Sequence, residues 1–428
     1  MTLPVCIAVP GDKSISHRAL IFASFAQGES ALRNLLAGED VQSTARVLRV
    51  LGCAIPPIPA DGAEVRVQGR GLRGWTEPRA QLDCGNSGTT ARLLLGALAA
   101  HPFRSVLTGD PSLRSRPMRR VTEPLERAGA QFHELGQPDR LPIEVRGGAL
   151  GAIEHTSPHA SAQVKSALLL AGLGAGVTVR VTEPRLSRDH TERMLRAMGV
   201  AVQTSFTNDG RVTSTLSPGA NPAPIDITVP GDPSSAAFFL ALGLAGARPI
   251  RVENVGLNPT RTGILAVLHR MGGRIDIESA GEAAGEPVGH LTAYPSRLHG
   301  ALVSADELPA MIDEVPILAV LASRAEGETR IEGAGELRVK ESDRLSALAS
   351  NLTALGVSVD ELADGLIVRG PLNAPSGRVR AFHDHRIAMA FGVLGALPGA
   401  VVEVDAPDVA AVSFPDFWKR LGEVMGRA

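Results

Sequence analysis

The chain has 428 residues, and 43 Lys and Arg against 45 Asp and Glu give a formal net charge of −2. This length exceeds what one ordinary hydrophobic core organises, so we expect at least two domains. The balanced charge argues against a nucleic-acid partner, which would call for a basic excess, and aromatic residues at 3% leave few rings for stacking bases. Because no apolar run approaches the roughly 18 residues that cross a bilayer, we expect no membrane partner.

The cysteines and the first residues indicate the compartment. Cys6, Cys53 and Cys84 show no CxxC pairing, which predicts a reducing environment and no structural zinc. The chain does not open with a basic segment followed by a short apolar run, so we expect no secretory signal and a cytoplasmic location.

The first predicted element is a short apolar strand that leads through Val-Pro-Gly-Asp at 9–12 into a helix from about Ser14. Ser14 and Arg18 are four residues apart and share one face of this helix, with Lys13 at its N-terminus. Helix N-termini carry partial positive charge, so a Lys and a hydroxyl there suit a phosphate. The same residues also fit a capped helix with surface charges.

Three similar candidates follow along the first half. The Gly-rich loop at 85–88 precedes a helix from about Thr89, and its backbone N–H groups can approach an anion. Arg116 precedes Pro117, which favours an extended backbone that presents its guanidinium. Ser161 and Gln163 stand ahead of another apolar helix. Each also fits a plain turn, a basic loop or a helix cap.

Charged residues stand ahead of apolar helices in the second half too. Asp313 and Glu314 precede "VPILAVLA" and fit either a helix cap or a general base kept ionised by cations. Two denser groups follow, namely Lys340, Glu341 and Arg344, then His383, Asp384, His385 and Arg386. The His-x-His spacing lacks a further ligand that completes a site, so we expect no metal. If all these helix starts converge, they form a pocket for a small, multiply negative ligand.

One recurring unit organises the whole chain: helix-like periodicity, then Gly, then strand-like alternation. It recurs at Gly52, Gly129, Gly199, Gly272, Gly356 and Gly422. Each glycine is predicted to end a helix in the left-handed conformation. The near-even spacing predicts six repeats. Val-Pro-Gly-Asp recurs at 229–232, so we expect two similar domains of three repeats, with the chain passing between them at the doubled strands.

Seven segments together resemble the 5-enolpyruvylshikimate-3-phosphate (EPSP) synthase family. They are "PGDKSISHRALI", "GNSGTTARLL", "RSRPM", "SAQVKSALLLAGL", "PGDPSSAAFFLA", "VKESDRL" and "DHRIAMA", in the family's order from residue 9 to residue 392. The resemblance implies an α/β (α+β) fold of two domains, each with three βαβαββ repeats and helices packed inside, and an active site in the cleft between them. It places residues 1–10 with 231–428 in one domain and 11–230 in the other.

The resemblance also implies a reaction. The enolpyruvyl group of phosphoenolpyruvate passes to the 5-hydroxyl of shikimate 3-phosphate, by addition and elimination through a tetrahedral intermediate, on the way to aromatic amino acids. We expect these two small molecules as partners, no cofactor and a monomer.

The family's site residues carry over to matching positions. Shikimate 3-phosphate is assigned to Lys13, Ser14, Arg18, Ser161, Ala162, Gln163, Arg188, Asp313 and Lys340. Phosphoenolpyruvate is assigned to Lys13, Gly88, Arg116, Gln163, Arg344 and Arg386. Asp313 is expected to take the proton of the 5-hydroxyl, and Glu341 to act as acid and base at the methylene carbon. Lys340 would stabilise charge and assist proton transfer, and Lys13, near phosphoenolpyruvate, is also counted among the catalytic residues.

Two departures and two alternatives accompany this assignment. Many family members carry a Lys directly before the C-terminal Phe-Pro, whereas this chain has no Lys at the position directly before Phe414. Some stack a Tyr on the shikimate ring, whereas Tyr294 lies outside that motif. UDP-N-acetylglucosamine enolpyruvyl transferases use a loop Cys, and this chain has none after Cys84. An inactive, anion-binding relative would have no need for carboxylates beside its anion pocket.

Overall fold

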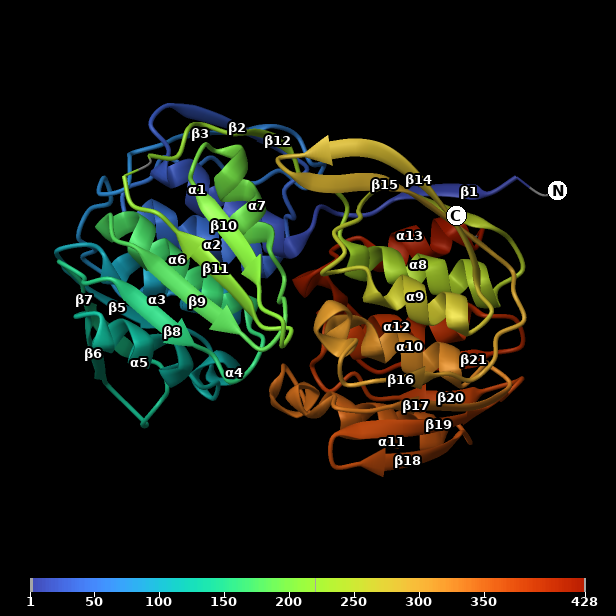
Figure 1. The fold of residues 1–428 in the computed structure, drawn as a ribbon. Coiled ribbons are helices and arrows are strands. Elements are labelled where there is room, and N and C mark those ends of the chain that lie inside the picture. The colour runs from blue at the N-terminus through green and yellow to red at the C-terminus, as the bar shows by residue number, and fades with distance from the viewer. Residues whose placement is uncertain (1–2, 220, 427–428) are drawn as a thin grey trace. The chain divides into compact units, whose positions relative to one another are not determined.

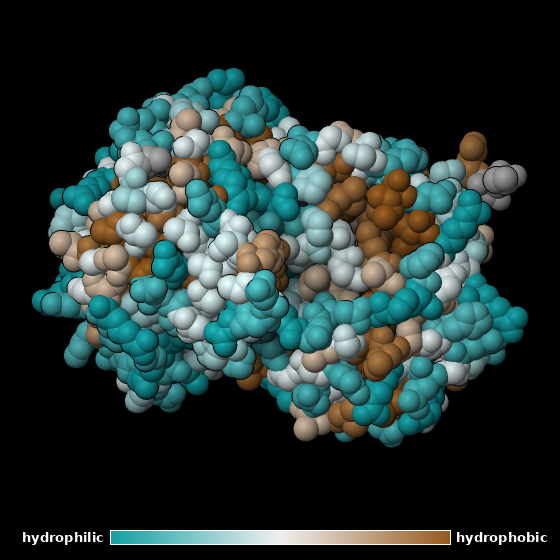
Figure 2. Space-filling view, in the orientation of Figure 1, coloured by the Kyte–Doolittle hydropathy of each residue, from teal (hydrophilic) through white to brown (hydrophobic). Residues whose placement is uncertain are grey.

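The structure is a computed structural model that describes residues 3–219 and 221–426. Its contacts divide the chain into two compact units (Figure 1). Unit 1 holds the described residues up to Pro10, Pro230–Glu282 and those from Pro287 onward. Unit 2 holds Gly11–Val229 with Ala283–Glu286. The face seen in Figure 2 shows hydrophilic residues interspersed with hydrophobic ones.

The described part of unit 2 contains three sheets built on one plan. The first has the order β4 (Leu82–Asp83), β5 (Arg104–Thr108), β7 (Ile143–Arg146), β6 (Gln131–Glu134). The second has the order β8 (Ile153–Thr156), β9 (Val179–Glu183), β11 (Val212–Leu216), β10 (Val202–Phe206). The third has β12 (Asp226–Thr228), β2 (Glu29–Arg33) and β3 (Val65–Gln68). In each sheet the first pair is parallel and the later pairs are antiparallel.

The helices of unit 2 supply half of the residues in its buried hydrophobic core. They are α1 (Lys13–Phe25), α2 (Glu39–Val50), α3 (Gly88–Ala99), α4 (Pro111–Arg114), α5 (Arg119–Arg127), α6 (Ala162–Ala175) and α7 (His190–Ala197). Helices α1, α3 and α6 are buried on nearly all sides, as helices without a polar face must be. Helices α3 and α6 approach so closely that a Cβ on Gly96 would lie 2.1 Å from the carbonyl oxygen of Ala167.

Unit 1 repeats the plan. One sheet has the order β1 (Val5–Ala8), β13 (Ile250–Gly256), β15 (Glu286–Tyr294), β14 (Arg274–Ala283). Another has β16 (Leu302–Val303), β17 (Gly327–Ile331), β19 (Gly365–Gly370), β18 (Ser358–Leu362), and a third pairs β20 (Ser376–Val379) with β21 (Val401–Val404). Its α-helices are α8 (Pro233–Ala245), α9 (Gly263–Arg270), α10 (Val315–Ala322), α11 (Arg344–Ala354), α12 (His385–Ala396) and α13 (Phe417–Val424). Helices α8, α10 and α12 are the buried ones.

The strands before the two Val-Pro-Gly-Asp segments are exchanged. Strand β1 precedes α1 of unit 2 in the chain, but it pairs with β13 of unit 1, with Val5 opposite Ile250. Strand β12 precedes α8 of unit 1, but it pairs with β2 of unit 2, with Asp226 opposite Ala31. The chain therefore leaves the sheet of one unit and enters a helix of the other at each copy of the motif.

The repeat glycines agree with the prediction at five positions out of six. Gly52, Gly129, Gly199, Gly272 and Gly356 follow helices and have φ values between 81° and 110°. The prediction is wrong at Gly422, because α13 continues through it to Val424. The residues after it are able helix formers, and one internal glycine costs only about 1 kcal/mol.

One strand that the repeat pattern predicts is also missing. No strand directly follows Gly52, and the next one is β3 at Val65. Pro56, Pro57 and Pro59 occupy this stretch. Proline has no N–H group for a sheet ladder, so this segment is a loop.

Candidate functional site

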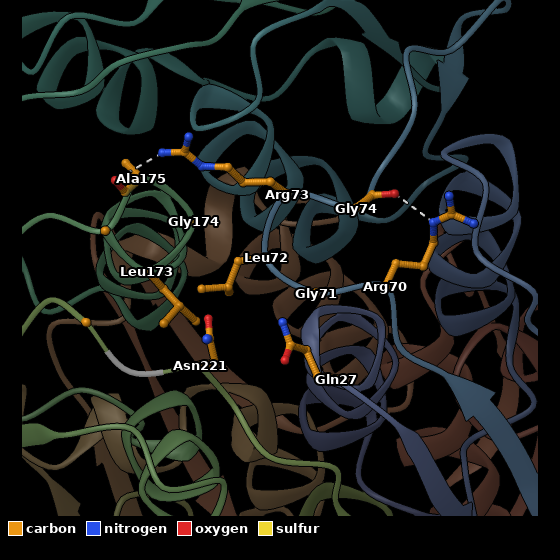
Figure 3. Close-up of a pocket in the computed structure, with 12 residues that line it drawn as sticks. Gln27, Arg70, Gly71, Leu72, Arg73, Gly74, Leu173, Gly174, Ala175 and Asn221 are labelled. Atoms are coloured by element: carbon orange, nitrogen blue, oxygen red, sulfur yellow. Dashed lines mark hydrogen bonds between the residues drawn. The ribbon is translucent and has the colours of Figure 1, made fainter.

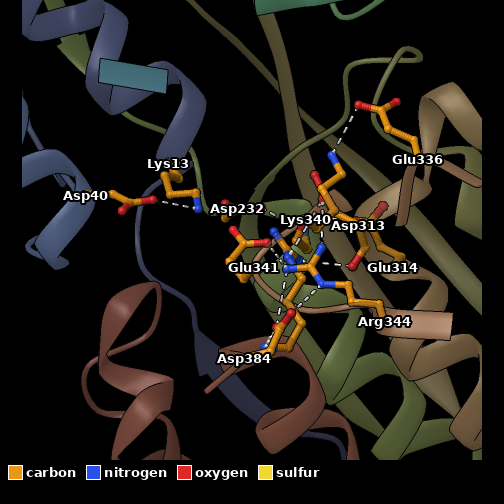
Figure 4. Close-up of polar contacts among 12 residues, drawn as sticks. Lys13, Asp40, Asp232, Asp313, Glu314, Glu336, Lys340, Glu341, Arg344 and Asp384 are labelled. Carbon is orange, nitrogen blue, oxygen red and sulfur yellow. Dashed lines mark hydrogen bonds and ion pairs between the residues drawn. The ribbon is translucent and has the colours of Figure 1, made fainter. Parts of the chain in front are cut away.

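The first helix start of unit 2 holds a cation beside a carboxylate. Asp12 caps α1, because its Oδ1 accepts a hydrogen bond from the N–H of Ile15 at 2.9 Å. The helix begins at Lys13, one residue before the expected start. The Nζ of Lys13 lies 3.0 Å from Oδ2 of Asp40 on α2 (Figure 4). Lys13 and Ser14 are half-buried, so both can meet a ligand at this helix end.

Arg18 lies one turn deeper and is only 2% exposed. Its Nε donates to Thr191 Oγ1 and its Nη2 to Ser166 Oγ, both at 2.7 Å, while Nη1 donates to the carbonyl of Ser14 at 3.0 Å. Burial lowers the pKa of Arg18 to about 10, so it stays charged at neutral pH. The nearby charge of Arg188 also lowers this pKa, which places two predicted phosphate ligands close together. Arg18 is therefore not a surface charge on a capped helix.

A row of buried polar groups behind Lys13 was not predicted. The Nδ1 of His17 lies 2.7 Å from Thr44 Oγ1, which lies 2.7 Å from Thr90 Oγ1. Thr90 in turn lies 2.8 Å from Ser87 Oγ, the residue that caps α3. The row ties α1, α2 and the start of α3 together. These residues are isolated small polar positions in the sequence, and nothing in their spacing signals the row.

The start of α3 is flanked by two guanidinium groups. A Cβ on Gly88, the first residue of α3, would lie 2.9 Å from Arg92 Nη1 and 3.4 Å from Arg116 Nη1. The Nη2 of Arg116 donates to Asn86 Oδ1 at 2.7 Å. The predicted pair Gly88 and Arg116 is therefore brought together, and Arg92 joins them. Glycine keeps this helix end open to a ligand.

Arg92 also connects the start of α3 to the start of α6. Its Nη1 donates to Oε1 of Gln163 at 2.7 Å, and Nε2 of Gln163 donates to Thr89 Oγ1 at 3.0 Å. Ser161 precedes α6, which begins at Ala162, and its side chain makes no capping hydrogen bond. Its backbone N–H donates instead to Glu183 Oε1 at 2.6 Å. A helix cap is thus not the role of the Ser161 hydroxyl.

In unit 1, Asp313 lies among three guanidinium groups. Its Oδ1 lies 3.5 Å from Arg344 Nη1 and 3.9 Å from Arg386 Nε, and its carbonyl accepts from Arg386 Nη1 at 3.1 Å. Asp313 sits in the 3₁₀ turn Ile312–Glu314 that precedes α10. The residue at the cap position is Glu314, without a side-chain capping bond. The simple helix-cap interpretation of Asp313 is therefore wrong.

Arg344 joins the predicted carboxylates (Figure 4). It is 1% exposed, and its Nη2 donates to Glu341 Oε2 and its Nε to Asp384 Oδ2, both at 2.7 Å. Burial alone would lower the pKa of Arg344, but the charges of Asp384 and Glu341 raise it above its ordinary value. Helix α11 begins at Arg344, so Lys340 and Glu341 precede the helix and do not share its face. The Nζ of Lys340 lies 3.6 Å from Glu336 Oε1.

Arg261 is a third buried cation of this group, and sequence reasoning missed it. It is 1% exposed, and its Nη2 donates to Asp232 Oδ1 at 3.0 Å and to Ser234 Oγ at 2.8 Å. Its Nη1 lies 3.9 Å from Asp313 Oδ2. Asp232 belongs to the second Val-Pro-Gly-Asp, whereas Arg261 lies in a loop without any motif, so the sequence carries no signal for their contact.

The two groups offer different chemistry. Unit 2 gathers cations, hydroxyls and helix N-termini, which suits the binding of phosphate. Unit 1 gathers several carboxylates with cations, which suits proton transfer next to an anionic ligand. Within residues 3–219 and 221–426, no group of three or more His, Cys, Asp or Glu is arranged to hold a metal ion. No helix in this part of the chain is long and apolar enough to cross a membrane.

A cavity of about 510 Å³ in unit 2 lies away from these residues. Figure 3 shows Gln27, Arg70, Leu72, Arg73 and Asn221 around it, together with Leu173 to Ala175. Those last residues belong to the C-terminal end of α6, whereas Ser161 and Gln163 stand at its N-terminal end. Since α6 has 14 residues, the two ends are roughly 20 Å apart. The cavity is therefore separate from the predicted site.

Comparison with known proteins gives one consistent answer. The EPSP synthase (3-phosphoshikimate 1-carboxyvinyltransferase) family matches residues 3–421. A 3-phosphoshikimate 1-carboxyvinyltransferase from Desulfitobacterium hafniense is 48% identical over 419 residues, 98% of this chain and 94% of that protein. One from Geobacter metallireducens is 46% identical over 422 residues, 98% of this chain and 96% of that protein.

Comparison with solved structures leads to the same family. An EPSP synthase from Acinetobacter baumannii superposes with a TM-score of 0.85 at 40% identity, covering 98% of this chain and 94% of that one. The enolpyruvyl transferase NikO from Streptomyces tendae shares the fold, with a TM-score of 0.76 at 20% identity over 99% of this chain and 95% of that one. The fold and the reaction class predicted from the sequence are thereby confirmed, and the chain belongs to the EPSP synthase family.

Proposed function

We propose that this chain transfers the enolpyruvyl group of phosphoenolpyruvate to the 5-hydroxyl of shikimate 3-phosphate and releases phosphate. The proposal places shikimate 3-phosphate on Lys13, Ser14, Arg18, Ser161, Ala162, Gln163, Arg188, Asp313 and Lys340. It places phosphoenolpyruvate on Lys13, Gly88, Arg116, Gln163, Arg344 and Arg386. The enzyme acts in the cytoplasm as a monomer, with residues 1–10 and 231–428 forming one three-repeat domain and 11–230 the other.

In the first step, Asp313 accepts the proton of the 5-hydroxyl while that oxygen attacks C2 of phosphoenolpyruvate. Glu341 gives a proton to C3, so the methylene carbon becomes a methyl group and a tetrahedral adduct forms. In the second step, Glu341 takes a proton back from the methyl group as the C2–O bond to phosphate breaks. Lys13 and Lys340 offset the negative charge that develops on the leaving phosphate.

One observation carries this assignment. A single buried guanidinium, Arg344, contacts both Asp313 and Glu341, and Arg386 stands on the other side of Asp313. Because they share Arg344, the two carboxylates lie close together, as a base and a proton shuttle require. The cations also offer a planar fork to the carboxylate or phosphate of phosphoenolpyruvate.

The test is phosphate release from phosphoenolpyruvate with purified protein, with shikimate 3-phosphate or UDP-N-acetylglucosamine as acceptor. We expect release with the first acceptor alone, and a product mass that equals enolpyruvylshikimate 3-phosphate. Release with UDP-N-acetylglucosamine alone would assign the chain to the other transferase reaction. Tight binding of shikimate 3-phosphate without any release would indicate an inactive, anion-binding relative.

Variants test the residue roles. We expect Asp313→Asn and Glu341→Gln each to lower kcat by about a hundredfold or more, since positioned proton transfer contributes 10²- to 10⁴-fold. Glu332→Gln is the matched control, because Glu332 is a half-exposed carboxylate of the same unit that pairs with Arg330. A kcat near that of the wild type for Asp313→Asn or Glu341→Gln would refute the assigned role.

A further inference from the structure

One buried carboxylate joins two of the proposed phosphate-binding segments. Glu183, the last residue of β9, is 2% exposed. Its Oε1 accepts from the backbone N–H of Ser161 at 2.6 Å, and its Oε2 accepts from the hydroxyl of Ser187 at 2.8 Å. Ser187 directly precedes Arg188. A single side chain therefore holds the entrance of α6 and the loop that carries Arg188.

A fully buried lysine contacts the Glu183 carboxylate. The Nζ of Lys165 lies 3.1 Å from Glu183 Oε2 and 2.9 Å from Glu192 Oε1, and it donates to the carbonyl of Ser187 at 3.4 Å. Lys165 and Glu192 are both within 1% of complete burial. Burial alone would lower the pKa of Lys165, but Glu192 and Glu183 raise it, so the ammonium persists. In this triad of Lys165, Glu183 and Glu192, the lysine holds the Glu183 carboxylate where it accepts both hydrogen bonds.

Stability gives no sufficient reason for this triad. Desolvation of buried charges often cancels their attraction, and an apolar packing of similar volume is commonly as stable or more stable. The triad does fix geometry. With its N–H held by Glu183, Ser161 keeps an extended backbone, φ −141° and ψ 99°, in which its side chain does not cap α6. The hydroxyl of Ser161 is thus presented for a ligand.

We propose that Glu183 is a positioning residue for shikimate 3-phosphate, which sets Ser161 and Arg188 at the spacing that its phosphate requires. The inference rests on the proposed function, and it concerns the binding of this substrate alone. Phosphoenolpyruvate affinity and the proton transfers depend on other residues, so a change at Glu183 acts on one substrate selectively.

The experiment compares Glu183→Gln with Glu192→Gln in the full-length protein. Both variants remove one carboxylate from Lys165, but Glu192 contacts neither Ser161 nor Ser187 among the contacts described. We expect Glu183→Gln to raise the KM and the calorimetric Kd for shikimate 3-phosphate about tenfold or more, the loss of roughly one charged hydrogen bond. We expect kcat and the KM for phosphoenolpyruvate to change less than about twofold, since uniform binding alone is lost.

A second variant guards against misfolding. Glu183→Asp keeps the charge beside Lys165 but shortens the side chain by one methylene, roughly 1.5 Å, so it cannot reach both partners. It should raise the same KM selectively at a Tm close to that of Glu192→Gln. Equal rises of KM in Glu183→Gln and Glu192→Gln, or an unchanged Kd in both Glu183 variants, would overturn the inference. A wild-type protein that binds shikimate 3-phosphate but releases no phosphate would instead refute the proposed function, and the Kd comparison would still decide the role of Glu183.

Discussion

His17 makes the stability of unit 2 depend on pH. The imidazole is buried on α1, and this burial lowers its pKa to about 3, with the cations Lys13 and Arg18 acting in the same direction against Asp40. In the unfolded chain a histidine has a pKa of about 6.5. Below pH 6.5 His17 therefore binds a proton in the unfolded chain, whereas in the folded unit it binds one only near pH 3. Acidification favours the unfolded state, and the folded unit loses stability over this window.

The size of the effect follows from the two pKa values. Each pH unit below 6.5 costs about 1.4 kcal/mol once the unfolded histidine is protonated. Between pH 7.5 and pH 5.0 the loss reaches roughly 2 kcal/mol. This is a large part of the 5–15 kcal/mol that usually holds a domain folded. Replacing His17 by Gln, which does not titrate and still offers Thr44 a hydrogen-bond partner, should remove the loss.

The assay uses the placement of the two tryptophans. Trp75 is buried in unit 2 and Trp418 lies in unit 1. In a Trp418→Phe background, fluorescence during urea unfolding reports unit 2 alone. We expect the free energy of unfolding to fall by about 2 kcal/mol more for the His17 protein than for His17→Gln between pH 7.5 and 5.0. His101, whose pKa burial also lowers, is present in both proteins and cancels.

If the free energy of unfolding falls equally with pH in the His17 protein and in His17→Gln, this reasoning is refuted. Such a result would mean that His17 takes up its proton in the folded unit near its ordinary pKa, so that solvent reaches the ring. A larger loss for His17→Gln than for the His17 protein would have the wrong sign and would exclude the buried neutral imidazole altogether.

Three further predictions concern buried cations and one glycine. Arg261→Met leaves its carboxylate partners without this cation and should lower the urea unfolding free energy of unit 1, read from Trp418 fluorescence, by about 3–5 kcal/mol; a loss under 1 kcal/mol would contradict it. Gly88→Ala places a methyl group against Arg92 and Arg116, so the KM for phosphoenolpyruvate should rise while Tm holds or increases, because alanine favours a helix; an unchanged KM would count against this site. Arg344→Lys keeps the charge but loses the fork, and kcat/KM should fall about 10- to 100-fold; full activity would exclude bidentate contacts.

Local features were predictable from the sequence because local physics decides them. Five of the six repeat glycines end helices with a positive φ, and the polar starts of apolar helices carry most of the proposed ligands. Gly422 and the segment after Gly52 differ for equally local reasons, helix-forming neighbours in one case and prolines in the other. The sequence could also have signalled Arg92. An arginine within "TTARLLLGAL" must find polar partners when the helix is buried, and Gln163 is one of them.

Contacts between distant segments could not be predicted in this way. Arg261 and Asp232 lie 29 residues apart, and Lys165 meets one carboxylate on β9 and another on α7. The local sequence around a loop arginine or within an apolar helix does not indicate which distant carboxylate it will pair with. These contacts depend on which helix start the fold brings beside which, and that information lies in the tertiary packing of each unit.

The doubled Val-Pro-Gly-Asp shows how one local structure came to serve two purposes. Asp12 and Asp232 perform the same task, since each caps the helix that follows it. In the first copy the next residue is Lys13, whose half-buried ammonium stands at the helix start within reach of a ligand.

In the second copy Pro233 takes that position, where proline suits the first turn of a helix but brings no charge. The cation comes instead from Arg261, which is buried, donates a hydrogen bond to Asp232 and lies 3.9 Å from Asp313. This buried guanidinium is not among the proposed substrate contacts, but it can fix the position of a neighbouring carboxylate and favour its charged form. The first motif therefore carries the cation that we propose for the substrate, and a cation beside the second motif positions the proposed base.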